Sequence, residues 1–138
     1  MLGENHPDLA VTLSNLGAVL IKTGDYAAAE PYLRQSHEIR RANFPAADRG
    51  LLATQGRLGV CLTKLGHFVE GESLLLDAYQ QIKALAGDDQ PWTSEAIQNL
   101  AELYDAWGRP AEARRWRGEL AAMSQPASVP TSAGAASP

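Results

Sequence analysis

The sequence predicts an all-α fold, an α-solenoid of three antiparallel helix pairs stacked in a row. A stretch of twenty residues, 13–32, is written three times along the chain. Gly24, Gly66 and Gly108 set the spacing of the copies at 42 residues. Within each copy the apolar residues recur three or four positions apart, which is the period of an amphipathic helix. A fixed period of this length is typical of repeat architectures, whose units bury their cores against one another.

Composition bounds the classes of function. The 138 residues carry a net charge of −4, and 45% of them are hydrophobic, as in a globular domain. The acidic balance disfavours a nucleic-acid partner, which usually requires a basic face. No apolar run is long enough to span a membrane. The first residues do not resemble a signal peptide, and the single cysteine, Cys61, suits a reducing compartment, so we expect a cytoplasmic protein with no membrane partner.

The first helix is expected over residues 7–23. Pro7 suits the first helical position, where its missing N–H is not needed. Gly24 should end this helix in a left-handed conformation, and Asp25 should cap the next helix. Because so short a connection separates the two helices, they must pack antiparallel.

The second helix is expected over 26–43 in spite of Pro31. A proline inside a helix removes a hydrogen bond and costs about 3 kcal/mol. The helix is still predicted because Ser73 and Arg115, at the corresponding positions of the later copies, do not interrupt the pattern.

The four remaining helices follow from the same signals. Phe44-Pro45 breaks the chain, and helices are expected over 46–65, 68–85, 91–107 and 110–123. Gly71 lies inside the fourth helix and is expected to mark a close approach of two helices. The sixth helix carries Arg117 where the earlier copies have leucine, so we interpret it as the polar cap of the array.

The domain organisation places the repeats between two other segments. Residues 1–8 resemble the linker at 85–92 and are interpreted as a linker remnant; the chain would then be the end of a longer array, the alternative being an atypical start. Residues 9–123 are expected to form the repeat domain. The remaining 124–138 lack aromatic and charged residues and are expected to be a disordered Pro/Ala/Ser tail. The three repeats cover about 7–43, 46–85 and 91–123.

Aligned on the glycines, the copies resemble the tetratricopeptide repeat, W-x2-L-G-x2-Y followed by A-x3-F. The matching residues are Leu13, Leu16, Gly17, Leu20, Ala29 and Leu33, then Leu58, Gly59, Leu62, Gly71 and Leu75, then Ile97, Leu100, Ala101, Tyr104 and Ala113. The signature tryptophan is absent, and Gln55 and Arg117 depart from the pattern.

The period of 42 residues resembles the longer repeats of kinesin light chains and their bacterial relatives, as do 6–8 (HPD) and 29–31 (AEP). The resemblance implies a right-handed superhelix whose groove is lined by the first helix of each pair. It also implies a scaffold or adaptor that binds a protein or peptide segment in that groove.

The resemblance assigns a peptide-binding groove to specific positions. These positions are Ser14, Asn15, Ala18, Lys22, Arg57, Val60, Lys64, Glu95, Gln98, Asn99 and Glu102, with Val11, Ala53, Gly56 and Ala106 as further groove positions. Asn15 and Asn99 occupy places where relatives hold a peptide backbone, a task that suits an amide because it both donates and accepts. The alternative is that each amide only faces water. The basic residues precede the acidic ones, so one end of the groove should be basic and the other acidic.

Catalytic chemistry is not expected. Cys61 lies among apolar residues and should be a buried structural thiol. The three histidines have no metal-ligand spacing, and no nucleophile elbow, zinc-protease motif or phosphate loop occurs. The sequence therefore predicts no enzyme activity, no cofactor and no metal.

Two alternative functions come from other classes. Residues 99–120 resemble the closing repeat found behind bacterial serine/threonine kinase domains, so the chain could be a regulatory segment of a larger signalling protein. The other alternative is a homo-oligomer, because the first helix has no preceding helix to cover it.

Overall fold

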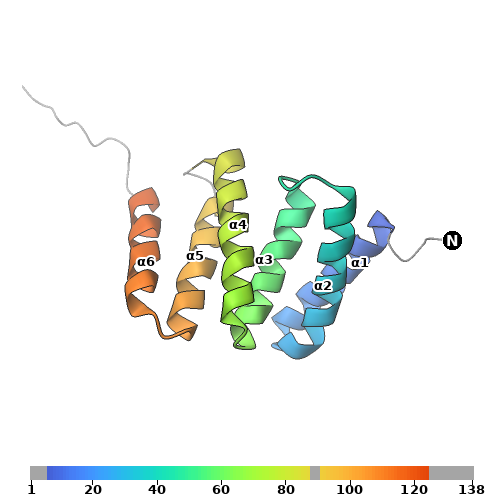
Figure 1. The fold of residues 1–138 in the computed structure, drawn as a ribbon, viewed down its shortest axis with the longest axis horizontal. Helices are drawn as coiled ribbons and strands as arrows, with labels where there is room; N and C mark the ends of the chain where they lie inside the picture. The colour runs from blue at the N-terminus through green and yellow to red at the C-terminus, as the bar shows by residue number, and fades with distance from the viewer. Residues whose placement is uncertain (1–5, 88–90, 125–138) are drawn as a thin grey trace, which may run out of the picture.

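The computed structural model describes residues 6–87 and 91–124, and all regular structure in these residues is helical. The helices are α1 (Pro7–Lys22), α2 (Tyr26–Asn43), α3 (Arg49–Lys64), α4 (Phe68–Ala86), α5 (Pro91–Ala106) and α6 (Pro110–Ser124). They stand side by side in a row from α1 to α6 (Figure 1). The structure therefore confirms the predicted α-solenoid of three antiparallel helix pairs.

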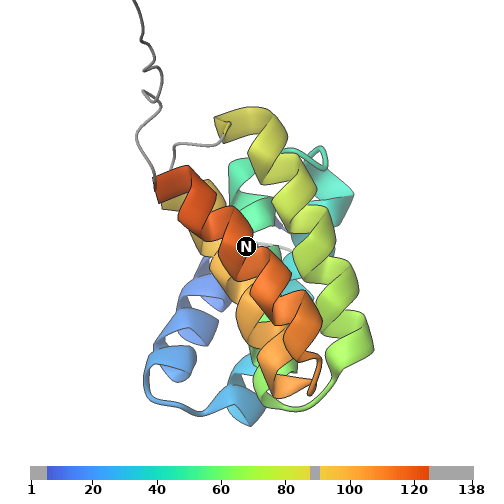
Figure 2. The same cartoon turned by 90° about the vertical axis from the view of Figure 1, so that its left-hand side faces the viewer.

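The first helix of each pair forms one layer of the solenoid. Each helix packs against its neighbours in the chain, and α3 additionally packs against α1 and α5. The second helices are further apart, and α2 and α4 are joined by a long side chain: Arg34 donates hydrogen bonds of 2.6 Å to Glu30 on its own helix and to Glu70 on α4. An end view along the row shows this two-layered arrangement (Figure 2). The tighter layer of α1, α3 and α5 is the inner one.

The turn inside each pair is built in the same way. Gly24, Gly66 and Gly108 have φ angles of +82°, +83° and +75°. A residue with a side chain would be strained in this conformation. After each glycine, the next backbone N–H donates a 2.8 Å hydrogen bond to a carbonyl of the preceding helix. Asp25 accepts a hydrogen bond from the N–H of Ala28 at 3.2 Å. The predicted glycine ends and the predicted Asp25 cap are confirmed.

The third helix begins at Arg49, so its predicted start at residue 46 is wrong. A carboxylate oxygen of Asp48 accepts a hydrogen bond from the N–H of Leu51 at 3.0 Å and caps the helix. The N–H of Asp48 itself donates to the carbonyl of Pro45 at 3.0 Å, which closes a turn over 45–48. The helix therefore begins after the capping aspartate and not next to Pro45. As a result α3 has 16 residues, as α1 and α5 do.

The ends of the chain differ slightly from the expected segments. Pro7 is the first residue of α1, and the ring nitrogen Nδ1 of His6 accepts a hydrogen bond from the N–H of Asp8 at 3.0 Å. Helix α2 continues through Pro31. Helix α6 includes Ser124, and the rest of the predicted tail, 125–138, lies outside the described residues, as do residues 1–5.

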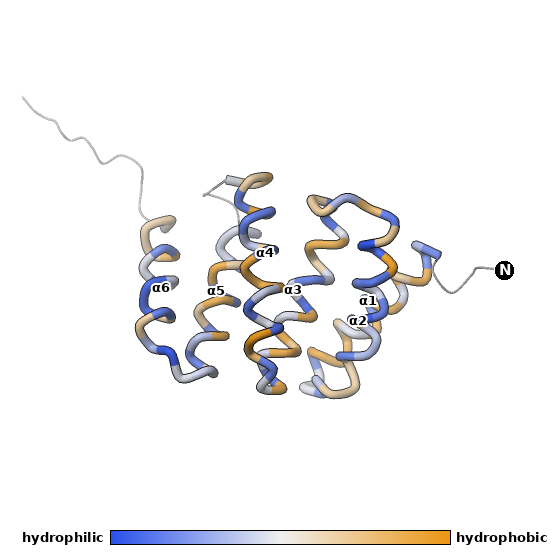
Figure 3. The backbone as a smooth tube through the Cα atoms, viewed as in Figure 1, coloured by the Kyte–Doolittle hydropathy of each residue, from blue (hydrophilic) through white to orange (hydrophobic). Residues whose placement is uncertain are grey.

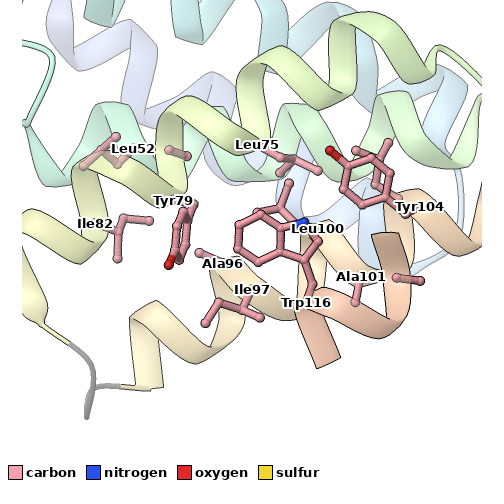
Figure 4. Close-up of a cluster of buried hydrophobic side chains, with 13 residues drawn as sticks. Leu52, Leu75, Tyr79, Ile82, Ala96, Ile97, Leu100, Ala101, Tyr104 and Trp116 are labelled. Carbon is pink, nitrogen blue, oxygen red and sulfur yellow. The ribbon is translucent and has the colours of Figure 1, made fainter. Parts of the chain in front are cut away.

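The apolar faces meet in three clusters of unequal size. Hydrophilic segments interrupt hydrophobic ones along the helices, as amphipathic packing requires (Figure 3). The largest cluster joins α3 to α6, and in it the rings of Tyr79 and Trp116 meet edge to face at 5.0 Å (Figure 4). The smallest lies within the first pair and consists of Ala10, Leu13 and Ile39, with Leu9 packed against it.

Two glycines of the first helices, Gly17 and Gly59, leave room for a leucine side chain of the second helix. A Cβ atom added at Gly17 would come within 2.5 Å of Leu33, and one added at Gly59 within 2.5 Å of Leu75. At Gly71 an added Cβ would meet its nearest atoms at 3.5 Å, which is ordinary contact. Gly71 does lie against the α3 backbone, since the nearest atoms include the carbonyl oxygen of Gly59, but the position has room for a Cβ and does not require glycine. In the first two pairs it is the first helix that lacks a side chain where the two helices close on each other.

Candidate peptide-binding groove

Two adjoining pockets open between α3 and α5 in the inner layer. The first has a volume of about 360 Å³, and we call it the Gly56 pocket because Gly56 is among its lining residues. The second, of about 400 Å³, is called the Lys64 pocket. Val60 and Asn99 border both pockets, so the two form one continuous groove along the facing sides of these helices.

The groove collects six of the eleven predicted site residues. The structure brings together Arg57, Val60, Lys64, Glu95, Asn99 and Glu102, and we call this set the α3–α5 seam. They meet because α3 packs against α5 and because residues three or four apart share one helix face. Asn99 is half-buried, and it is the predicted backbone-binding amide that lies in the groove.

Ser14 lies under the inner surface, since only 3% of it is exposed. Its hydroxyl oxygen lies 3.1 Å from that of Thr54 and accepts a hydrogen bond from a guanidinium nitrogen of Arg57 at 2.7 Å. Because α1 packs directly on α3, this position is covered by the neighbouring repeat. Ser14 therefore positions Arg57 and does not line the groove.

The remaining predicted residues are spread over the same layer. Asn15, Lys22 and Gln98 are exposed, and Ala18 is half-buried. None of these four lines either of the two pockets. Asn15 and Asn99 therefore differ in surroundings although they correspond in the repeat.

Opposite charges face each other across the seam. Arg57 and Glu95 line the Gly56 pocket, while Lys64 and Glu102 line the Lys64 pocket. Asp105 adds little negative charge to the α5 side, because it forms an ion pair with Arg117 of α6. That guanidinium lowers the pKa of the Asp105 carboxyl below its ordinary value. The expected polarity therefore runs across the groove from α3 to α5, and each pocket receives both signs of charge.

The apolar floor of the Gly56 pocket includes residues that sequence reasoning missed. Leu52 and Ile82 belong to the buried core, and Trp92 is half-buried beside them. The guanidinium of Arg49 lies 4.8 Å from the centre of the Trp92 ring and covers it from the α3 side. Ile82 comes from a second helix, which the groove assignment left out. Trp92 precedes the first groove position of its repeat, so the repeat pattern holds no signal for either residue.

The one cysteine of the sequence lies in the core. Cys61 is fully buried, and burial raises the pKa of its thiol to about 11, which confirms the expected structural thiol. Within residues 6–87 and 91–124, no group of three or more His, Cys, Asp and Glu side chains is placed to hold a metal ion. No helix in the same ranges is both long and apolar enough to cross a membrane.

One polar network joins α2, α3 and α4. A ring nitrogen, Nε2, of the buried His37 is 3.3 Å from the amide oxygen of Gln55. The amide nitrogen of Gln55 donates to the carbonyl of Leu74 at 2.9 Å and to Asp77 at 2.8 Å. This network explains how Gln55 fills a position that is apolar in the other two copies, because its hydrogen-bonding groups are satisfied.

Comparison with known proteins agrees with this architecture. BtubC (BKLC) from P. vanneervenii, a solved structure, superposes with a TM-score of 0.78 at 18% sequence identity. The match covers 86% of this chain and 47% of BtubC, so the chain spans about half the length of that protein. At this identity the likeness shows the fold alone. No curated protein matched the chain.

The family follows from the sequence profile of the tetratricopeptide repeat, which matches residues 2–42 and 50–123. The matched ranges contain almost all of the six helices and both pockets of the groove. The chain therefore belongs to the tetratricopeptide repeat family.

Proposed function

We propose that this domain is a protein-interaction module that binds an extended peptide or protein segment along the α3–α5 seam and acts as a scaffold or adaptor. The observation that carries the proposal is the gathering of six groove residues around two adjoining pockets. Both volumes fall within the range of about 300–1,000 Å³ that is usual for ligand sites. Asn99 borders both pockets, and its amide can donate to and accept from a peptide backbone.

Several finer statements belong to the same proposal. The domain would act without catalysis and without a cofactor, in the cytoplasm, and with a protein rather than a nucleic acid as its partner. If the domain belongs to a larger bacterial signalling protein, such as a serine/threonine kinase, the groove would be its binding arm.

The groove can be tested with a display library of random twelve-residue peptides. We expect wild-type protein to retain peptides that Asn99→Ala retains at least tenfold less well. The control is Gln80→Ala, which removes an exposed amide from a second helix. Circular dichroism would establish equal folding. Peptides retained equally by both variants would place binding outside the seam, and a wild type that retains none would contradict the proposal.

The outer face of α1 supports a second candidate function, self-association. Leu16 and Val19 are 40% and 57% exposed. Their counterparts in the later repeats, Leu58 with Cys61 and Leu100 with Leu103, are at most 1% exposed, because a preceding helix covers them. A second copy of the chain would bury this apolar face in the same way.

Light scattering over a range of protein concentrations tests this candidate. We expect the mass to rise with concentration for the wild type and to stay at that of a monomer for Leu16→Glu/Val19→Glu. Val69→Glu is the control, since this apolar residue is 74% exposed on α4, away from the α1 face. A wild type that is monomeric at all concentrations would rule out self-association by this face.

A further inference from the structure

We propose that the Gly56 pocket is an anchor site that accepts one large apolar side chain, aliphatic or aromatic, from the bound segment. This inference rests on the proposed function and adds the chemical class of the ligand. It predicts that ligands of this domain share a bulky apolar residue.

The opening of the pocket depends on the absence of a side chain at Gly56. A Cβ atom added there would meet nothing within 4 Å, so the space above the helix is empty. The corresponding positions of the other repeats hold Ser14 and Gln98, whose side chains extend from the same place on the first helix. The missing side chain of the middle repeat therefore leaves this space open.

The walls of the pocket suit an apolar group. Leu52, Ile82 and Trp92 supply aliphatic and aromatic surface from three helices, and Val60 adds an aliphatic wall on α3. Burying apolar surface against such walls is favourable in proportion to the area removed from water. A large side chain that fills such a pocket is the kind of anchor that dominates binding at protein interfaces.

Two charged residues, Arg57 and Glu95, also line the pocket, and Arg57 already has a hydrogen-bond partner. The guanidinium of Arg57 is drawn towards α1 by its 2.7 Å hydrogen bond to Ser14. Glu95 is exposed and Asn99 is half-buried on the α5 side. A charged side chain placed inside would lose its hydration against apolar walls. The polar rim would instead contact the backbone of the segment, while the apolar side chain points inward.

Filling the pocket from within gives a direct test. Gly56→Leu places a leucine in the empty space and should leave the fold intact. Gly118→Leu is the matched control, because Gly118 is also a helical glycine where an added Cβ meets nothing within 4 Å, and it lies on α6 outside both pockets. We expect Gly56→Leu to weaken binding of the library-selected peptides at least tenfold and Gly118→Leu to change it less than twofold. Replacing the shared apolar residue of those peptides with serine should cause a similar tenfold loss.

The outcomes separate this inference from the proposed function. Peptides that depend on Asn99 but bind Gly56→Leu normally would overturn the anchor site and leave the groove in place. If no peptide is retained, the probe becomes N-acetyl-phenylalaninamide, with N-acetyl-lysinamide as control, followed by the Trp92 indole signal in nuclear magnetic resonance. A shift of that signal with the phenylalanine probe alone, lost in Gly56→Leu, would support the pocket without the groove. No shift in the wild type would overturn it.

Discussion

At the scale of single residues, four glycines inside the helices differ in how much space surrounds the missing side chain. Gly17 and Gly59 admit a leucine from the partner helix, and neither has room for a Cβ atom. Gly56 faces open space, and Gly71 would accept a Cβ at ordinary contact distance. The same residue type therefore serves helix packing at the first two positions and an open surface at Gly56. The difference lies in which side of the helix each glycine occupies.

We expect Gly59→Ala to lower the free energy of unfolding by about 1–3 kcal/mol, because the new methyl group would overlap the buried Leu75 side chain. A gain of up to about 1 kcal/mol in helix propensity offsets part of this loss. Gly56→Ala, on the same helix, should raise the free energy of unfolding by up to about 1 kcal/mol, because alanine has the higher helix propensity and its methyl group meets no other atom there. Urea unfolding followed by circular dichroism measures both, and changes of equal sign would contradict the packing at Gly59.

His37 should make stability depend on pH. Burial lowers the pKa of His37 below its ordinary value, against a smaller opposing effect of the hydrogen bond to Gln55. The unfolded chain therefore binds a proton more readily than the folded protein near pH 6. The contribution of His37 to stability is complete above the unfolded pKa of about 6.5 and is lost as the pH falls below that value.

The expected loss for the wild type is at most about 1.4 kcal/mol per pH unit between pH 6.5 and the folded pKa. His37→Gln cannot titrate and should flatten this part of the curve. Urea melts at pH 8.0, 6.0 and 5.5 test it, in a range above the ordinary pKa values of carboxyl groups. Equal slopes for the variant and the wild type would exclude His37 as the source.

At the scale of helices, the contact between the two helices of a pair differs between the first two pairs and the third. In the first two pairs a leucine of the second helix packs against a glycine of the first, Leu33 on Gly17 and Leu75 on Gly59. In the third pair both members have changed, because Ala101 and Arg117 occupy the corresponding positions. Arg117 instead forms an ion pair with Asp105. The last pair thus has a small side chain in place of the glycine and a charged residue in place of the leucine.

This pairing predicts a coupling between α5 and α6. Arg117→Leu alone should destabilise the domain, because the Ala101 methyl group takes the space that a glycine leaves for leucine in the other pairs. Adding Ala101→Gly should recover part of the loss, with a coupling energy of about 0.5–3 kcal/mol in a double-mutant cycle of urea unfolding. The control cycle pairs Ala101→Gly with Arg114→Leu, an exposed position on α6. Additive effects in both cycles would contradict the shared packing arrangement.

Sequence reasoning found the features that depend on short stretches of chain. The glycine ends of helices, the Asp25 cap and the helix periodicity are local, and the structure confirms them. The start of α3 was misplaced because Pro45 and Asp48 are both start signals, and the hydrogen bond to Leu51 decides between them. The burial of Ser14 depends on how closely α1 packs on α3, which no local pattern encodes.

The candidate groove was predictable only in part for the same reason. The repeat register locates the face of each first helix, and this suffices to find Asn99 and its neighbours on the seam. The floor of the Gly56 pocket comes from a second helix and from a residue before the first groove position, Ile82 and Trp92. Those contributions follow from the spacing and tilt of packed helices.

At the scale of the whole molecule, the core is unevenly distributed. The largest cluster holds thirteen buried residues and joins α3 to α6, whereas the cluster of the first pair holds three. The outer face of α1 is also exposed at Leu16 and Val19. Local opening costs least where few apolar contacts hold a segment. The first pair also shares a second cluster with α3, through Ala29 and Leu33 of α2, so the weakly held element is α1. We therefore expect α1 to open more easily than α4 and α5.

Hydrogen exchange followed by mass spectrometry should reveal this gradient. We expect the amide hydrogens of α1 to exchange faster than those in the middle of α4 and α5, which lie within the largest cluster. If the α1 face is covered by a second copy, raising the protein concentration should slow exchange in α1 and leave α5 unchanged. Equal protection of α1 and α5 at low concentration would contradict the uneven core.

The serial packing of the helices has a mechanical consequence. Each helix packs only on near neighbours in the chain, so a pulling force applied at the two ends passes through every pair in turn. The domain should then yield by peeling from its α1 end, with each 42-residue repeat that unravels releasing about 140 Å of chain. Held between two anchored partners, it would lengthen in steps under load and lose its groove only when the peeling reaches α3.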